Sequence, residues 1–212
     1  MIVIRFQPRL IFLSADPEQV RAQIVGTNVT LAQAQPLRDD VSTDEITPLP
    51  VMVHFDATLG RYPYVGFTAG GEQPIARDAV KRAGIEVVVA GKRYGKGSSR
   101  EHSVVAERAA GVRLVIAESF ERIYRQNADN VGLFTSTDFG LIDRIARGEA
   151  IAVDELLAGR DELAAAILRA GGLLGFGRGK VWHAGPSTGS GRTEVGAATC
   201  PVHPEQIGRA HV

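Results

Sequence analysis

A glycine-rich stretch near the middle of the chain reads Gly91-Lys92-Arg93-Tyr94-Gly95-Lys96-Gly97-Ser98-Ser99-Arg100-Glu101-His102. Residues 85–90, directly before it, are apolar and mostly β-branched, which predicts a buried strand. Residues 103–110, directly after it, contain neither Gly nor Pro, which is compatible with a helix. The sequence therefore predicts a strand and a helix joined by a glycine-rich turn, as in an α/β fold.

The polar groups of this turn favour an anion-binding site. Gly95 and Gly97 permit backbone conformations and close approaches that a side chain would forbid. Ser98 and Ser99 stand where the helix should begin, and either could cap it. The amides at a helix start attract anions, and the planar guanidinium of Arg100 suits a carboxylate or a phosphate. We therefore expect an anion site with two hydroxyls and one guanidinium at its mouth.

Two nucleotide-binding motifs fit this stretch poorly. A P-loop requires G-x-x-x-x-G-K-[ST], but only three residues separate Gly91 from Gly95, and Lys96 is followed by another glycine. A dinucleotide fingerprint requires G-x-G-x-x-G, and Arg100 occupies the place of its third glycine. A phosphate- or nucleotide-binding module therefore remains only as the alternative of another class.

Three blocks of the sequence resemble the aconitase superfamily. Residues 97–102 are similar to the G-S-S-R-E-H signature of the mobile swivel domain of this superfamily. Residues 40–48 look like its D-x-x-[ST]-T-D-x-I segment. Residues 113–133 are similar to a third family segment, in which a strand is followed by a helix with the pattern S-F-x-x-I, by an Asn and by the pattern G-L-[LF]. The three blocks occur in the family's order and cover residues 36–145.

The resemblance implies both a fold and an activity. The fold would be an aconitase-type swivelling β/β/α domain, with a mixed sheet flanked by helices. The activity would be that of the small subunit of a hydro-lyase, which reversibly dehydrates and hydrates a hydroxy di- or tricarboxylate such as isopropylmalate. The small subunit of a homoaconitase or of another hydroxy-diacid dehydratase is the alternative within this class. A non-catalytic paralogue is disfavoured because the polar residues of the family site are all present.

The resemblance also assigns roles to the motif residues. Ser98, as an alkoxide, would remove a proton from the carbon beside a substrate carboxylate. Ser99 and Arg100 would bind that carboxylate. Thr43 and Asp44 would orient the loop or the substrate hydroxyl. Hydroxide would leave onto the iron of a [4Fe–4S] cluster that a large subunit holds.

Four more residues are expected around this site. Glu101, His102 and Asn127 are expected to brace the loop rather than to take part in the chemistry. Arg61, in an expected loop over residues 56–63, could read the variable end of the substrate. It belongs to no fixed motif, so an ordinary surface arginine is the simpler interpretation.

Composition sets limits on the class of protein. With 212 residues, the chain suits one domain with at most a small appendage. Lys and Arg, 24 in all, balance 24 Asp and Glu, so no nucleic-acid partner is indicated. No apolar run reaches the roughly 20 residues of a membrane span, and the first residues do not resemble a signal peptide. We therefore expect a cytoplasmic protein without a membrane partner.

The single cysteine, Cys200, rules out an intrachain disulfide. It also rules out an iron–sulfur cluster on this chain alone, because such clusters need several thiolates. We therefore expect no metal on this chain and a partner large subunit that binds the cluster.

The chain is expected to have three parts. Residues 1–35 would form a βα extension packed on the core, residues 36–178 the swivel domain, and residues 179–212 a disordered tail. Gly, Ser, Thr and Pro dominate the tail, and its end resembles a translated sequencing adapter, so we expect it to be dispensable. Other strands are expected within 2–13, 51–55, 64–67, 113–117 and 133–136, and other helices from Asp16 and within 75–83, 119–130, 139–147 and 152–170.

Overall fold

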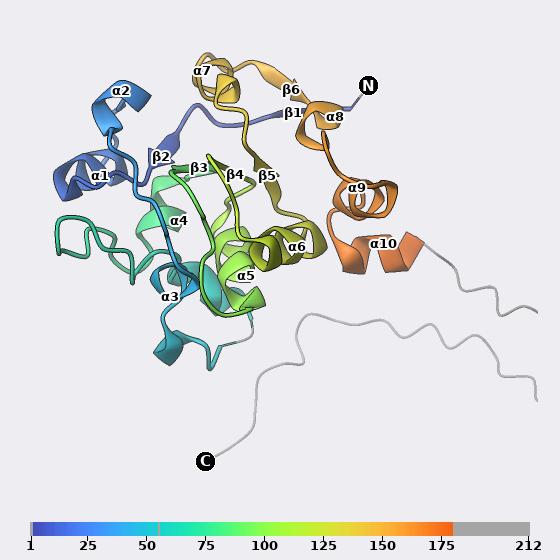
Figure 1. The fold of residues 1–212 in the computed structure, drawn as a ribbon, viewed down its shortest axis with the longest axis horizontal. Helices are drawn as coiled ribbons and strands as arrows, with labels where there is room; N and C mark the ends of the chain where they lie inside the picture. The colour runs from blue at the N-terminus through green and yellow to red at the C-terminus, as the bar shows by residue number, and fades with distance from the viewer. Residues whose placement is uncertain (1, 55, 180–212) are drawn as a thin grey trace, which may run out of the picture. The chain divides into compact units, whose positions relative to one another are not determined.

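The computed structural model describes residues 2–54 and 56–179, and its centre is a four-stranded parallel sheet. The strands run in the order β2 (Leu10–Phe12), β3 (Val87–Ala90), β4 (Leu114–Ala117) and β5 (Phe134–Ser136) (Figure 1). β3 and β4 are buried along their whole length, as their uninterrupted apolar runs predict. Residues 180–212, which include Cys200 and all but the first residue of the expected tail, lie outside the described residues.

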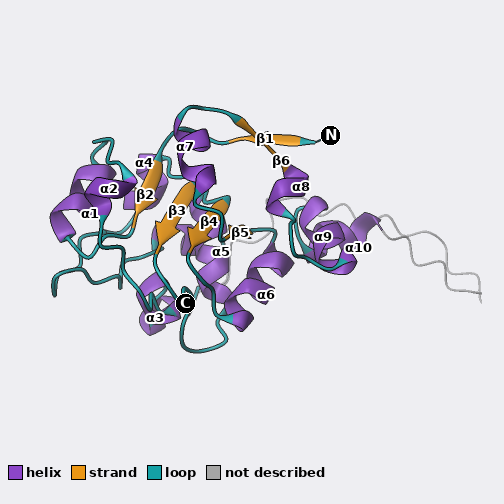
Figure 2. Cartoon of the chain, turned by 45° about the horizontal axis from the view of Figure 1, so that its top comes forward, coloured by secondary structure: helices purple, strands orange, loops and turns teal. Residues whose placement is uncertain are grey.

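Helices cover both faces of this sheet (Figure 2). Successive strand residues point to opposite faces, so Val88 and Val87 belong to different buried clusters. The cluster on the Val88 face includes residues of α1 (Pro17–Ile24), α4 (Ala79–Ala83), α5 (Glu101–Ala110) and α6 (Arg122–Val131). The cluster on the Val87 face includes residues of α2 (Leu31–Ala34), α7 (Gly140–Ala146) and α8 (Val153–Leu156). The expected α/β class, a sheet flanked by helices, is confirmed.

A second, smaller sheet joins the start of the chain to a segment before the last helices. β1 (Val3–Arg5) pairs antiparallel with β6 (Ala150–Ala152), so both kinds of strand pairing occur in the molecule. α9 (Glu162–Arg169) and α10 (Leu173–Gly179) follow. α10 was not predicted, because its glycines favour a turn over a helix. None of the helices in the described part of the chain is long and apolar enough to cross a bilayer.

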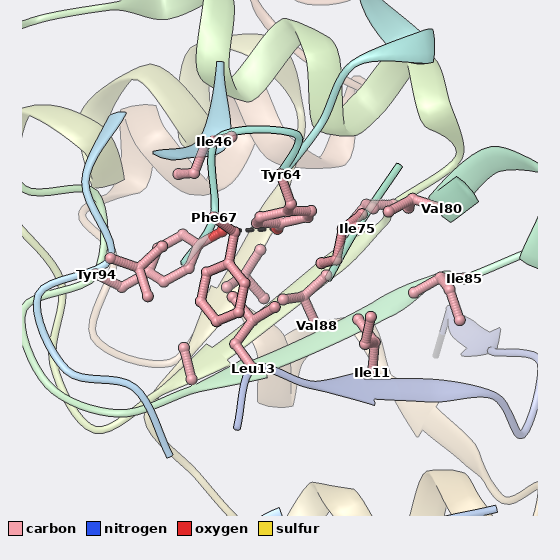
Figure 3. Close-up of a cluster of buried hydrophobic side chains, with 14 of the residues drawn as sticks. Ile11, Leu13, Ile46, Tyr64, Phe67, Ile75, Val80, Ile85, Val88 and Tyr94 are labelled. Atoms are coloured by element: carbon pink, nitrogen blue, oxygen red, sulfur yellow. Dashed lines mark hydrogen bonds between the residues drawn. The ribbon is translucent and has the colours of Figure 1, made fainter. Parts of the chain in front are cut away.

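Two short apolar runs that predicted strands form other structures. Leu49–Val51 is a 3₁₀ helix, η1, and Phe55 lies outside the described residues. Residues 64–67 form a turn in which Tyr64 has a φ of 66°. The side chains of Tyr64 and Phe67 are nevertheless fully buried in the core (Figure 3). These residues were apolar because they fill the core, and a short apolar run does not by itself identify a strand.

Two short helices occur where none was predicted from the sequence. α3 (Thr43–Ile46) begins with Ser42 as its N-cap, and the Glu45 side chain completes a capping box. The 3₁₀ helix η2 (Ala57–Arg61) begins at Asp56, whose side chain accepts a hydrogen bond from the Thr58 amide. Both helices begin with a short oxygen-bearing side chain of the kind that caps helices. The apolar pattern alone did not indicate these helix starts.

The loops after β3 and β4 meet at the carboxyl edge of the parallel sheet. The amide of Tyr94 donates to the Ser119 carbonyl (2.9 Å), and the amide of Glu121 donates back to the Tyr94 carbonyl (2.9 Å). Open parallel α/β sheets bind ligands outside the carboxyl ends of their strands. The glycine-rich stretch therefore lies where this architecture places a site.

Candidate functional site

Hydrogen bonds fasten the glycine-rich loop to the segment before α3. The Gly95 amide donates to the Val41 carbonyl (2.9 Å), and the Thr43 amide donates to the Lys96 carbonyl (2.8 Å). The Thr43 hydroxyl also donates to the Ser98 carbonyl (3.3 Å). Two of the three family-like blocks are therefore joined directly, and Thr43 holds the backbone of the residue expected to react.

Glycine is required at two positions of this loop. Gly95 has a φ of +81°, and a Cβ there would lie 2.2 Å from Cγ of Tyr124. Gly97 has a φ of +110°, and a Cβ there would lie 3.3 Å from the Thr43 hydroxyl oxygen. The close approaches expected from the sequence are thus made to an aromatic ring and to a threonine of the protein itself.

Ser98 and Ser99 are both exposed, and neither caps the following helix. α5 begins at Glu101 with Arg100 as its N-cap residue, and this helix start has no side-chain cap. The sequence-based prediction of a serine cap was therefore wrong. The chain turns once more after Ser98, whose carbonyl accepts a hydrogen bond from the Arg100 amide (2.8 Å). Both hydroxyls are consequently left on the surface, where a ligand can meet them.

Arg100 and Asp44 form an ion pair beside the two serines. An Nη1 hydrogen of Arg100 bonds Oδ1 of Asp44. The Arg100 side chain is 14% exposed, whereas that of Asp44 is 60% exposed. Among the described residues no other side chain bonds this guanidinium, so it retains hydrogen-bond donors for a second carboxylate. The ion pair with Asp44 therefore shows that the Arg100 guanidinium is placed where it can bind a carboxylate.

A cleft of about 340 Å³ opens beside Ser98. The loop contributes one wall, and the first turns of α6 contribute the other. The lining residues are Gly95, Gly97, Ser98, Glu121, Arg122, Ile123 and Gln126. Ile123 is 48% exposed, because Tyr124 and Ala128 occupy the buried face of the helix. An apolar side chain therefore faces the cleft.

The structure brings most of the expected site residues together. Ser98, Thr43, Asp44 and Arg100 are linked by the contacts above, and Ser99 lies between two of them in the chain. These contacts are geometric, and the chemical roles of the residues remain predictions.

The expected bracing residues differ in burial. Glu101 is exposed, and His102 and Asn127 are half-buried. Within the described chain, no hydrogen bond joins the Asn127 side chain to the loop. The bracing role of these residues therefore remains a prediction.

Arg61 is not brought to Ser98. Its Nε and Nη2 donate to the two carboxylate oxygens of Asp78, each at 2.9 Å. This hydrogen bonding raises the pKa of Arg61 and lowers that of Asp78. The neighbouring Gly60 packs against Ala109, at the far end of α5 from the serines. The contacts of Arg61 are therefore those of a surface arginine with a partner of its own.

A buried polar cluster beneath the loop was missed by sequence reasoning. Glu107 on α5 is fully buried and accepts hydrogen bonds from the hydroxyls of Tyr64, Tyr94 and Tyr124. Burial raises the pKa of Glu107 to about 7, although the three hydroxyls oppose this shift. One signal was available: Glu107 lies between Ser103 and Ala110 at helical spacing, on the face that α5 buries.

The described residues do not form a metal site. No group of three or more His, Cys, Asp or Glu side chains in residues 2–54 and 56–179 is arranged to hold a metal ion. The chain's single cysteine cannot supply the thiolates of an iron–sulfur cluster. The residues of this chain therefore do not fit such a group by themselves.

Comparisons with known proteins identify the family. Residues 66–137 match the family model of the aconitase C-terminal domain. The 3-isopropylmalate dehydratase small subunit of Pyrobaculum neutrophilum is 37% identical over 153 residues, which cover 65% of this chain and 90% of that protein. This chain belongs to the family of 3-isopropylmalate dehydratase small subunits.

Further members show the same extent of similarity. The small subunit from Pyrobaculum aerophilum is 35% identical over 153 residues, covering 65% of this chain and 90% of that protein. A crystal structure of 3-isopropylmalate dehydratase (leuD) from Methanocaldococcus jannaschii is 29% identical and covers 66% of this chain and 88% of that chain, with a TM-score of 0.47. The predicted family and the predicted class, an aconitase-type hydro-lyase small subunit, are confirmed, and a nucleotide-binding module is not favoured.

Proposed function

We propose that this chain forms, with a large subunit, a hydro-lyase that moves a hydroxyl group on isopropylmalate or a closely related hydroxy-diacid. One observation carries the proposal. Exposed Ser98 and the guanidinium of Arg100 lie at one edge of the sheet, on a loop that Thr43 clamps. The relatives named as 3-isopropylmalate dehydratase small subunits support the choice of substrate.

In this proposal the proton acceptor is the side-chain oxygen of Ser98 in its alkoxide form, which becomes a hydroxyl when it takes the proton. The carbon acid beside a carboxylate is weak, so the base must be placed within hydrogen-bond reach of the proton. A serine can act as a base near neutral pH only where fixed hydrogen-bond donors stabilise its alkoxide. The guanidinium of Arg100, two residues along the chain, and the positive end of the α5 dipole can do so.

Arg100 would bind the carboxylate next to the proton that leaves. The negative charge on that carboxylate increases as the proton leaves, and a planar guanidinium can stabilise this charge with two parallel hydrogen bonds. Asp44 holds one nitrogen of the guanidinium and so fixes its orientation. The substrate then binds to donors that are already positioned.

Replacing Arg100 with lysine should therefore weaken substrate binding more than turnover. A lysine ammonium keeps the charge but cannot reproduce the planar fork. We expect KM to rise by about tenfold, with a smaller change in kcat, because a lost charge-assisted hydrogen bond is worth about 1.5 to 3 kcal/mol. Steady-state kinetics of the reconstituted enzyme measures both constants. A change confined to kcat would contradict the binding role.

The cluster of this enzyme would belong to the partner subunit. The residues of this chain do not fit an iron–sulfur cluster, whereas members of its family are named as small subunits. When bound to the partner, the cluster would supply a Lewis acid for the departing oxygen. The residues of this chain would bind the carboxylate and hold the proton acceptor.

The large subunit would then cover the face that carries the cleft. Ile123, an exposed apolar residue beside Ser98, would become buried at that contact. We expect Ile123→Asp to weaken association of the two subunits by at least about tenfold, because it buries a charge at an interface. Val25→Asp is the matched control: Val25 is 82% exposed but lies at the end of α1. Equal affinities of the two variants, measured by calorimetry, would argue against this face.

The proposed activity is tested by reconstitution. The chain alone, the cluster-loaded large subunit alone, and the two together are supplied with isopropylmalate, and formation of the unsaturated acid is followed by absorbance. We expect turnover only with both chains. Homologous tricarboxylates, in a parallel assay, separate a homoaconitase from an isopropylmalate enzyme. Absence of turnover on every hydroxy acid, with a loaded and associated partner, would reject the proposal.

A further inference from the structure

A single buried carboxylate connects three parts of the molecule beneath the cleft. Oε1 of Glu107 accepts hydrogen bonds from the hydroxyls of Tyr64 (2.5 Å) and Tyr94 (2.6 Å). Oε2 accepts one from the hydroxyl of Tyr124 (2.6 Å). The hydroxyl oxygens of Tyr64 and Tyr94 also lie 2.7 Å from each other (Figure 3). All four side chains are buried, so the network is shielded from water.

Two of the three tyrosines are buried side chains of the two segments that form the walls of the cleft. Tyr94 is part of the glycine-rich loop itself. Tyr124 is on α6, next to the cleft residue Ile123, and its ring packs directly beneath Gly95. The rings of Tyr94 and Tyr124 meet edge to face, with centroids 5.0 Å apart. Glu107 therefore ties the loop that carries Ser98 to the opposite wall.

The helix that carries Glu107 adds a third connection. α5 begins at Glu101, two residues after Ser99, and the Ser103 hydroxyl in its first turn donates to the Thr43 carbonyl (3.1 Å). Glu107 lies one turn further along the same helix face. One helix therefore contacts the Thr43 segment through Ser103, and the loop and α6 through Glu107.

This arrangement is costly for a part of a hydrophobic core. A buried carboxylate loses its hydration, and apolar residues of similar volume usually give equal or greater stability. Three phenol donors compensate the loss only in one relative arrangement of their elements, because hydrogen bonds need defined distances and angles. The network therefore specifies geometry more than it adds stability.

We infer that Glu107, acting through Tyr94 and Tyr124, is a positioning residue that holds the Ser98 loop and the α6 wall in the arrangement the reaction needs. This inference rests on the proposed function. Glu107 does not touch the substrate, and it acts only through the two tyrosines. Tyr64 bonds the same carboxylate but belongs neither to the loop nor to α6.

That difference provides a matched set of variants. Tyr94→Phe, Tyr124→Phe and Tyr64→Phe each remove one hydroxyl from Glu107 and keep the ring. In the reconstituted enzyme, we expect the first two to lower kcat by about tenfold or more with little change in KM, since displacements near 1 Å can cost about a hundredfold. Tyr64→Phe should lower the melting temperature by about as much as the other two variants, but it should change kcat by less than about twofold. Equal kcat for all three variants would overturn the inference.

Hydrogen exchange of the full chain alone tests the same inference without any activity. The amides of Gly95 and Lys96 both donate to the Val41 carbonyl, at 2.9 and 3.2 Å. We expect these two amides to exchange about tenfold faster in Tyr124→Phe than in Tyr64→Phe, with amides of β3 and β4 unchanged. Equal rates at the loop amides would overturn the inference even if the proposed reaction is correct. An inactive reconstituted enzyme with the expected exchange pattern would instead reject the proposed function alone.

Discussion

Replacing Ser98 with alanine is expected to lower the kcat of the reconstituted enzyme by about a thousandfold, the middle of the range for a general base. KM should change little, because Arg100 and its ion pair with Asp44 are left intact. The loop should also keep its shape, since Thr43 bonds the backbone carbonyl of Ser98 and not its side chain. Steady-state kinetics, with substrate affinity measured by calorimetry, separates the two effects.

Ser99→Ala is the matched control for this prediction. It removes the same hydroxyl group one position along the loop, from a residue that is exposed as well. If Ser99 only contacts the substrate carboxylate, its loss should raise KM and leave most of kcat. A Ser98→Ala enzyme that keeps more than about a tenth of wild-type kcat would show that another group takes the proton.

The parts of the site that could be predicted from sequence are those fixed by local chemistry. Gly95 and Gly97 were expected to allow close approaches, and both have positive φ angles in tight contacts. The strands at β3 and β4 were predicted because buried parallel strands are apolar without interruption. Asp16 and Pro17 marked the start of α1, where Asp16 is indeed the N-cap. In each case, a few residues that are neighbours in the sequence determine the local conformation.

The parts that could not be predicted depend on distant residues. Tyr64 and Phe67 indicated a strand, but they are apolar because they fill a core built from other elements. Ile123 belongs by its spacing to a buried stripe, yet the packing of Tyr124 turns it outward. The partner of Glu107 is a set of hydroxyls from three separate segments, and no local pattern specifies it. Tertiary contacts decide these positions, so sequence periodicity alone could not.

Glu107 should also give the chain a pH-dependent stability of unusual sign for a carboxylate. Burial raises its pKa in the folded chain from the usual 4.5 to about 7. The folded state therefore keeps a proton that the unfolded chain has already released. The stability due to this proton is complete below pH 4.5 and is lost as the pH rises through about 7. The groups that face Glu107, the hydroxyls of Tyr64, Tyr94 and Tyr124, have pKa values raised by burial and stay neutral in this range.

The measurement is the difference in unfolding free energy between the wild-type chain and Glu107→Gln, taken by denaturant titration at several pH values. Glutamine keeps an acceptor for the tyrosines but cannot ionise. A shift from 4.5 to about 7 should make this difference fall by about 3 kcal/mol as the pH rises from about 5 to about 8.

Glu155→Gln provides a control of opposite sign. The hydrogen bond from Arg144 lowers the pKa of Glu155, so its contribution is present above the unfolded pKa and is lost as the pH falls. A difference for Glu107→Gln that is independent of pH would mean that the carboxylate is ionised throughout, stabilised fully by its three phenols. The network would then hold a permanent charge beneath the loop, and the loop geometry should not respond to pH near neutrality.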